Sequence, residues 1–153
     1  MTKRLLVIFC SVFLGTYLFA QTDTQVYDSV LAKRLGADER GMKSYILAIL
    51  KTGSNKLAPG EERDNLFKGH FANINAMAES GKLVIAGPID ENERTYRGIF
   101  ILNVKTVDEA KELLKADPTI SQKIFAVEYY EWYGSAAISE YLKVHKLIEK
   151  GSH

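Results

Sequence analysis

The chain has 153 residues, of which 46% are hydrophobic and 25% are charged, and its formal net charge is +1. This balance is typical of one globular domain and excludes a fibrous or an intrinsically disordered protein. The positive charges form no stripe along the sequence, so we do not expect nucleic acid as a partner.

The first 20 residues have the pattern of a secretory signal peptide. A short basic start precedes an uncharged apolar run over residues 5–20 that ends at Ala20. We expect cleavage near Ala20 and a periplasmic or secreted protein with no stable membrane insertion. A retained membrane anchor is the alternative, because the run is only slightly shorter than a membrane-spanning helix. A lipoprotein signal fits less well, since Cys10 lies in the middle of the run.

Cys10 is the only cysteine of the chain. After cleavage the mature protein would have no disulfide, although the compartment would permit one. We therefore expect packing and association to supply its stability.

The spacing of apolar residues predicts a series of strands and helices after the signal. The predicted strands cover residues 44–52, 82–86, 96–104 and 124–133. The predicted helices cover residues 27–35, within an N-terminal extension over 21–42, and then 60–80, 106–117 and 136–150. Residues 151–153 are a tail to which we give no role.

Local signals set three of these bounds. Gly87-Pro88 is expected to end the second strand at residue 86. Thr106 and Glu109 have the spacing of a capping box, in which each side chain accepts a hydrogen bond from a free backbone N–H at the start of a helix. Asp117-Pro118 is expected to end that helix, because proline disfavours helical geometry in the preceding residue.

The order strand, helix, strand, strand, helix, strand over residues 43–133 predicts an α+β, ferredoxin-like fold. Its four-stranded antiparallel sheet would carry both helices on one face. The first strand is apolar on both faces, with Tyr45, Leu47 and Ile49 alternating with Ile46, Ala48 and Leu50. An apolar face without helices is unfavourable in a monomer, so we expect a homodimer that buries it.

His70 lies at core-facing spacing on the predicted helix over residues 60–80. Its ordinary role would be a core histidine bonded to a backbone carbonyl. If a carboxylate reaches one ring nitrogen, His70 becomes a proton-transfer group. Asp117 and Asp90 are the candidate partners, although each also suits a structural role at a helix end or in a turn.

Further candidates for substrate contact lie on the third and fourth strands. Arg97 shares the alternation of Ile99 and Ile101, and Glu128 lies among aromatic residues that include Trp132. Arg97 would bind a carboxylate or an enolate through two parallel hydrogen bonds, or it would pair with Glu128 at the rim. We expect no metal and no cofactor, because no histidine pair has ligand spacing and no glycine-rich phosphate loop is present.

A helical histidine, the segment AGPID at residues 86–90 and the segment ADPTI at residues 116–120 precede an aromatic last strand. In this order they resemble the YCII-related (YciI-like) domain family over about residues 43–133. The resemblance implies a dimeric α/β barrel with a pocket near the histidine. It also implies site roles for His70, for the loop residues Gly87, Pro88 and Asp90, and for Asp117.

Two functions follow as hypotheses. The first is an exported enzyme in which His70 and an aspartate carry out isomerisation, elimination or hydrolysis of a small organic molecule without a cofactor. The second is a non-enzymatic periplasmic module that binds a small ligand or docks on another protein. The helices outside residues 43–133 would cover the pocket, enlarge the dimer contact or bind that partner.

Overall fold

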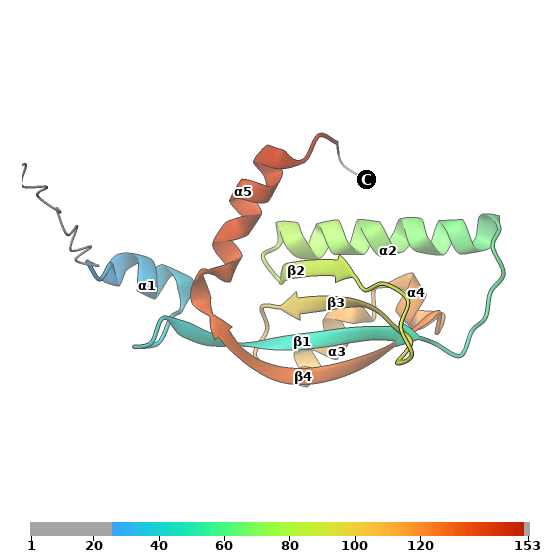
Figure 1. Ribbon diagram of the computed structural model, residues 1–153, viewed down its shortest axis with the longest axis horizontal. Helices are drawn as coiled ribbons and strands as arrows, with labels where there is room; N and C mark the ends of the chain where they lie inside the picture. Colours follow the sequence, from blue (N-terminus) through green and yellow to red (C-terminus); the bar gives the residue numbers. More distant parts are fainter. Residues whose placement is uncertain (1–25, 152–153) are drawn as a thin grey trace, which may run out of the picture.

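The computed structural model describes residues 26–151, so the predicted signal peptide lies outside the described residues. The elements, in chain order, are α1 (Ser29–Leu35), β1 (Met42–Thr52), α2 (Glu61–Glu79), β2 (Leu83–Pro88), β3 (Tyr96–Leu102), α3 (Val107–Leu114), α4 (Pro118–Ser121), β4 (Phe125–Ser135), the 3-10 helix η1 (Ala136–Glu140) and α5 (Tyr141–Ile148) (Figure 1).

The four strands form one antiparallel sheet in the order β2-β3-β1-β4. Strand β1 lies inside the sheet and pairs along its whole length with β4. This order, with α2 and α3 as the two connecting helices, confirms the predicted ferredoxin-like fold.

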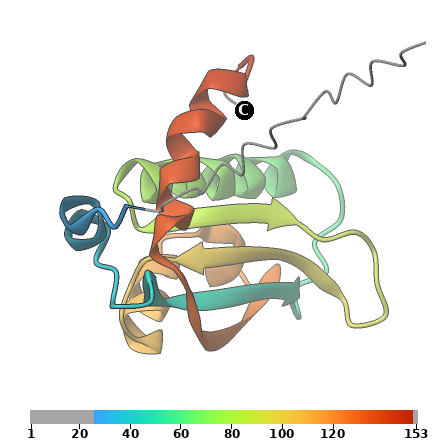
Figure 2. The same ribbon diagram turned by 60° about the vertical axis from the view of Figure 1, so that its left-hand side comes forward.

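The main core lies between the sheet and the helices α2 and α3. From the sheet it contains Ile46, Ala48, Leu50, Leu83, Phe100 and Leu102, and from the helices Met77, Ala110 and Leu114. In Figure 2, α2 lies behind the sheet and α5 rises in front of it from the end of β4. The strand residues that face this core recur with a period of two, as expected for strands with one face against helices.

The opposite face of the sheet carries a second, smaller cluster. Tyr45, Val84 and Ile101 are buried there, and Trp132 and Ile138 pack against them. Because Ile138 belongs to η1, the C-terminal segment covers one end of this face. Farther along the same strands, Leu47, Ile49 and Ile99 are only half-buried. The homodimer that would cover this part remains a prediction.

Strand β2 extends two residues beyond its predicted end, because Gly87 and Pro88 still pair with β3. The prediction that Gly87-Pro88 ends the strand is therefore wrong. The reason is position: β2 lies at the edge of the sheet, where a missing backbone N–H is tolerated.

Helix α3 begins as the sequence predicts but ends earlier. Thr106 Oγ1 accepts a hydrogen bond from the Glu109 backbone N–H at 3.1 Å, which confirms this half of the capping box. The Glu109 carboxylate accepts from the N–H of Lys105 and not of Thr106. The helix ends at Leu114, and a separate short helix, α4, begins at Pro118.

The terminal helices are present, but the C-terminal one is divided into η1 and α5. Arg34 near the end of α1 forms an ion pair with Glu140 of η1 at 3.0 Å, so the two extensions lie together. None of the helices within residues 26–151 has the length and apolar character needed to cross a bilayer.

Candidate functional site

His70 lies in α2 on the side that faces the sheet, and only 6% of its surface is exposed. Four aromatic rings surround its imidazole, with ring centroids 5.5 to 6.1 Å away, and they belong to Phe67, Phe71, Phe100 and Phe125. Such a setting excludes most water, so a polar partner inside it has a large effect on the imidazole.

That partner is Asp117. Its Oδ2 lies 2.6 Å from His70 Nδ1, and the aspartate side chain is completely buried. The two residues are 47 positions apart, and they meet because α4 packs against α2. The expected His-Asp contact is therefore present, and Asp117 makes it.

Thr119 completes the cluster and was not predicted from the sequence. Its hydroxyl donates to Asp117 Oδ1 at 2.7 Å, and its backbone N–H donates to the same oxygen at 2.9 Å. Asp117 is thus the N-cap of α4, with Pro118 at the first helical position, a combination that favours a helix start. This signal in Asp117-Pro118-Thr119 would have placed Thr119 beside the carboxylate.

Gly69 allows α4 to approach His70 closely. An ideal Cβ atom at Gly69 would lie only 2.6 Å from Pro118 Cγ, which is closer than two carbon atoms can pack. The residue beside His70 therefore has to lack a side chain for Pro118, and with it Asp117, to reach this position.

The pKa of Asp117 lies below the ordinary aspartate value of 3.8. Burial acts in the opposite direction and raises the pKa, because it disfavours a charge. The hydrogen bonds from His70 and Thr119 outweigh it and keep the carboxylate ionised.

These contacts fix which ring nitrogen of the neutral imidazole carries the proton. An ionised carboxylate only accepts hydrogen bonds, so His70 Nδ1 must be protonated to donate to Asp117. The Thr119 hydroxyl donates its proton to Asp117, and it can only accept from Nδ1, which lies 3.2 Å away. The other nitrogen, Nε2, therefore has a free lone pair in the neutral ring.

Nε2 also keeps contact with solvent. Within residues 26–151, every buried side-chain nitrogen and oxygen has a hydrogen-bond partner. Nε2 has none among the hydrogen bonds of these residues, in which His70 uses Nδ1 alone. Nε2 is thus not completely buried, and its free lone pair is the feature that a general base requires.

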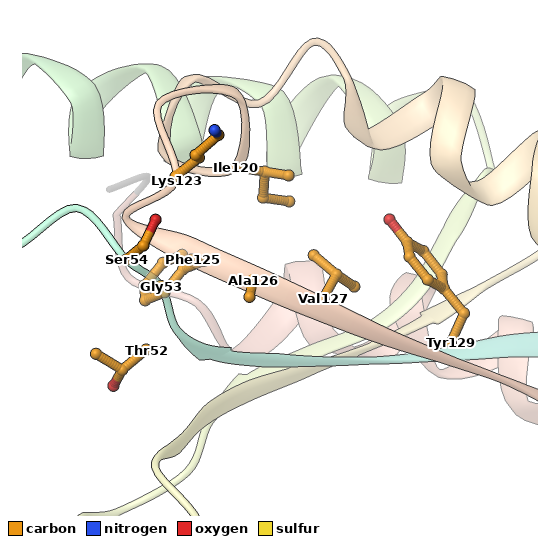
Figure 3. Close-up of a pocket in the computed structure, with 9 residues that line it drawn as sticks. All are labelled: Thr52, Gly53, Ser54, Ile120, Lys123, Phe125, Ala126, Val127 and Tyr129. Atoms are coloured by element: carbon orange, nitrogen blue, oxygen red, sulfur yellow. The ribbon is translucent and has the colours of Figure 1, made fainter.

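Two hollows lie beside the cluster without including His70. The β4 hollow, of about 420 Å³, is lined by residues that include Ser54, Ile120, Phe125, Val127 and Tyr129. In Figure 3 the side chains of Val127 and Tyr129 rise from β4 towards the helical layer. The β1–α2 hollow, of about 510 Å³, is lined by residues that include Thr52, Lys56, Arg63, Phe67, Arg97 and Phe125. Phe125 lines both hollows, and its ring packs against His70.

The other acidic candidate lies away from the histidine. Asp90 is exposed in the β2–β3 connection, and its backbone carbonyl accepts a hydrogen bond from Asn92. Pro88, at the exposed end of β2, lines neither hollow. Asp117 and not Asp90 is therefore the partner of His70.

Strand alternation predicted that Arg97 shares a face with Ile99 and Ile101, but in the structure it does not. Pairing passes from Leu50 opposite Gly98 to Lys51 opposite Tyr96, so Arg97 has no partner on β1. This bulge turns its side chain into the β1–α2 hollow, where Nε donates to Thr52 Oγ1 at 2.8 Å.

Glu128 and Trp132 lie on the opposite face of the sheet. Glu128 pairs with Lys51 at 2.7 Å and not with Arg97, while Trp132 packs on Tyr45 with ring centroids 5.7 Å apart. Their predicted contact with substrate therefore has no link to His70 within one chain. No group of three possible metal ligands among histidine, cysteine, aspartate and glutamate occurs in the part of the chain that the structure describes.

Comparison with protein families gives one match. The sequence model of the YCII-related domain matches residues 42–133, a range that runs from the start of β1 into β4 and contains the His70 cluster. No curated protein matches the chain.

Proposed function

The chain belongs to the YCII-related domain family, and on that premise we propose that it is a small exported enzyme that transfers protons without a cofactor. The observation that carries the proposal is the hydrogen bond of 2.6 Å between His70 Nδ1 and a fully buried Asp117. It leaves Nε2 as the free and solvent-contacting nitrogen. A buried carboxylate behind a histidine is the arrangement that prepares a general base.

In the proposed reaction, His70 Nε2 takes a proton from a carbon acid or from water. The ring becomes an imidazolium, and Asp117 stabilises its positive charge. The ring then returns the proton to another atom of the substrate or to the leaving group. Isomerisation, elimination and hydrolysis all follow this scheme. Asp117 and Thr119 are positioning residues, because they act through the imidazole.

Export and dimerisation belong to the same proposal. Export is supported by the apolar pattern of residues 5–20. Dimerisation is supported by the half-buried Leu47, Ile49 and Ile99 on the face that carries no helix of the core. A second copy on this face would enclose the apolar side chains of both sheets.

Hydrogen–deuterium exchange tests the chemistry without a known substrate. The full chain is incubated in D₂O with a panel of small carbonyl compounds and organic acids, and exchange at carbon is followed by ¹H NMR. We expect catalysed exchange on at least one compound, reduced about 100-fold or more by His70→Gln. His145→Gln, on the exposed helix α5, should leave the rate unchanged. Equal rates for the wild type and His70→Gln would contradict the proposal.

A non-catalytic binding module is the second candidate, and one observation favours it. Neither hollow is lined by His70, so a ligand could bind there without meeting the imidazole. In that case a ligand would protect the chain against unfolding equally well with and without His70.

A further inference from the structure

The β1–α2 hollow carries an excess of positive charge. The cationic residues Lys56, Arg63 and Arg97 line it, and no aspartate or glutamate does. None of the three forms an ion pair within residues 26–151. The acidic residues at the start of α2 are Glu61, Glu62 and Asp64, and none of them pairs with these cations.

Arg97 is held with its outer donors free. Its Nε donates to Thr52 Oγ1 at 2.8 Å, and Nη1 makes one long contact of 3.5 Å with a backbone carbonyl. Nη2 makes no hydrogen bond among the described residues, although the side chain is partly buried. A guanidinium fixed through Nε presents its two terminal nitrogens as a fork, which matches the two oxygens of a carboxylate.

The remaining wall is mainly apolar, although Thr52 and Asn55 also line it. Leu57, Phe67, Ile124 and Phe125 line the hollow, and the Arg63 guanidinium lies 5.1 Å from the centroid of the Phe67 ring. The volume of about 510 Å³ is suitable for a small organic molecule. Cations beside aromatic walls favour an anion with an apolar body over a bare inorganic ion.

We propose that the β1–α2 hollow is a binding site for a small organic carboxylate, whose carboxyl group is held by Arg97 and Arg63 and whose apolar body lies against Phe67 and Phe125. Both rings also pack on His70. Organic acids are therefore the substrate class that we infer for His70. Only this inference, and not the binding site itself, rests on the proposed function.

Binding of benzoate tests the proposal on the full chain. Amide chemical shifts are followed by ¹H–¹⁵N NMR, and we expect saturable shifts around Thr52 and Arg97 with a dissociation constant of about 1 mM or tighter. Benzamide, which has the same shape without the charge, should bind about tenfold more weakly. Inorganic phosphate should also bind more weakly, because it cannot fill the apolar part.

Matched arginine variants locate the binding. Arg97→Gln and Arg63→Gln should each weaken benzoate binding about tenfold. Arg94→Gln should leave it unchanged, because Arg94 is exposed in the β2–β3 connection and lines neither hollow. The proposal is overturned if benzoate fails to saturate the wild type at about 20 mM. Equal affinity for benzamide, or equal binding by the Arg63 and Arg94 variants, also overturns it.

His70→Gln separates this proposal from the catalytic one. The variant should bind benzoate like the wild type but lose deuterium exchange. If benzoate binds and no compound undergoes catalysed exchange, the hollow stands and the catalytic proposal fails. If exchange depends on His70 but benzoate does not bind, the catalytic proposal stands and the hollow is not an organic-acid site.

Discussion

The two faces of the sheet each hold a short contact to a carboxylate that is supported by hydroxyl groups, and the two pairs of residues differ in burial. His70–Asp117, on the helical side, has a contact of 2.6 Å, and its side chains are 8% and 0% exposed. Lys51–Glu128, on the opposite face, has a contact of 2.7 Å, and its side chains are 32% and 34% exposed. The contact distance alone therefore does not determine how much a pair affects stability or chemistry.

Burial decides the difference in two ways. Water can replace either partner of Lys51–Glu128, so the pair has a small effect on stability and chemistry. No water replaces Asp117, whose oxygens are used by His70 and Thr119. The orientation and tautomer of His70 are fixed as a result, while the side chain of Glu128 shares its hydrogen bonds with Tyr130 and Lys51.

The largest effect is expected from truncating the buried carboxylate. Asp117→Ala leaves His70 Nδ1 and the Thr119 hydroxyl without their acceptor and removes the cap of α4. We expect a loss of about 3 kcal/mol in the free energy of unfolding, measured by urea denaturation. Glu128→Ala is the matched exposed truncation and should cost much less. Equal losses would show that burial does not distinguish the two pairs.

A smaller loss is expected from Gly69→Ala. Alanine has a higher helix propensity than glycine. At residue 69, however, its Cβ would lie 2.6 Å from Pro118 Cγ and push α4 away from α2. We expect a net loss of about 1–3 kcal/mol in urea denaturation. Asn75→Ala, at an exposed position of the same helix, should cause no loss. Stabilisation by Gly69→Ala would mean that the close packing of α4 does not constrain residue 69.

The smallest effect is expected from acid pH, which removes the contribution of the ionised Asp117 carboxylate to stability. The pKa of Asp117 is lower in the folded chain than its ordinary value of 3.8, so folding favours the ionised form. Its contribution to stability is complete above about pH 4 and is lost as the pH falls through the folded pKa.

Asp117→Asn isolates this contribution, because the other carboxylates titrate in both proteins. One of them is Glu140, whose pKa is lowered to about 2 by hydrogen bonds from Arg34 and Lys143. Urea denaturation of the wild type and the variant should give a stability difference that shrinks as the pH falls below about 4. A difference that widens towards low pH would contradict the assigned direction.

The fold could be predicted from the sequence because the core elements have clear periodicity and clear signals at their ends. Alternating apolar residues predicted β1 and β3, and Thr106 marked the start of α3. Errors arose where one signal has two uses. Gly87-Pro88 predicts the end of a strand, but an edge strand tolerates proline. Asp117-Pro118 predicts the end of a helix, but it also suits the start of the next helix.

The candidate site was predictable only in part. The position of His70 on the apolar face of α2 could be predicted from spacing. The choice between Asp90 and Asp117 depends on how α4 packs against α2, which local patterns do not encode. Regular alternation predicts the wrong face for Arg97, because one bulge shifts the alternation of β3.

The central claim is that Asp117 holds the proton of neutral His70 on Nδ1 and leaves Nε2 free. The direct measurement is ¹⁵N NMR of the His70 ring at a pH where the imidazole is neutral, in the wild type and in Asp117→Asn. We predict the Nδ1–H form in the wild type, with Nε2 unprotonated. In the variant, the amide donor would favour the Nε2–H form. An Nε2–H form of His70 in the wild type would contradict this account.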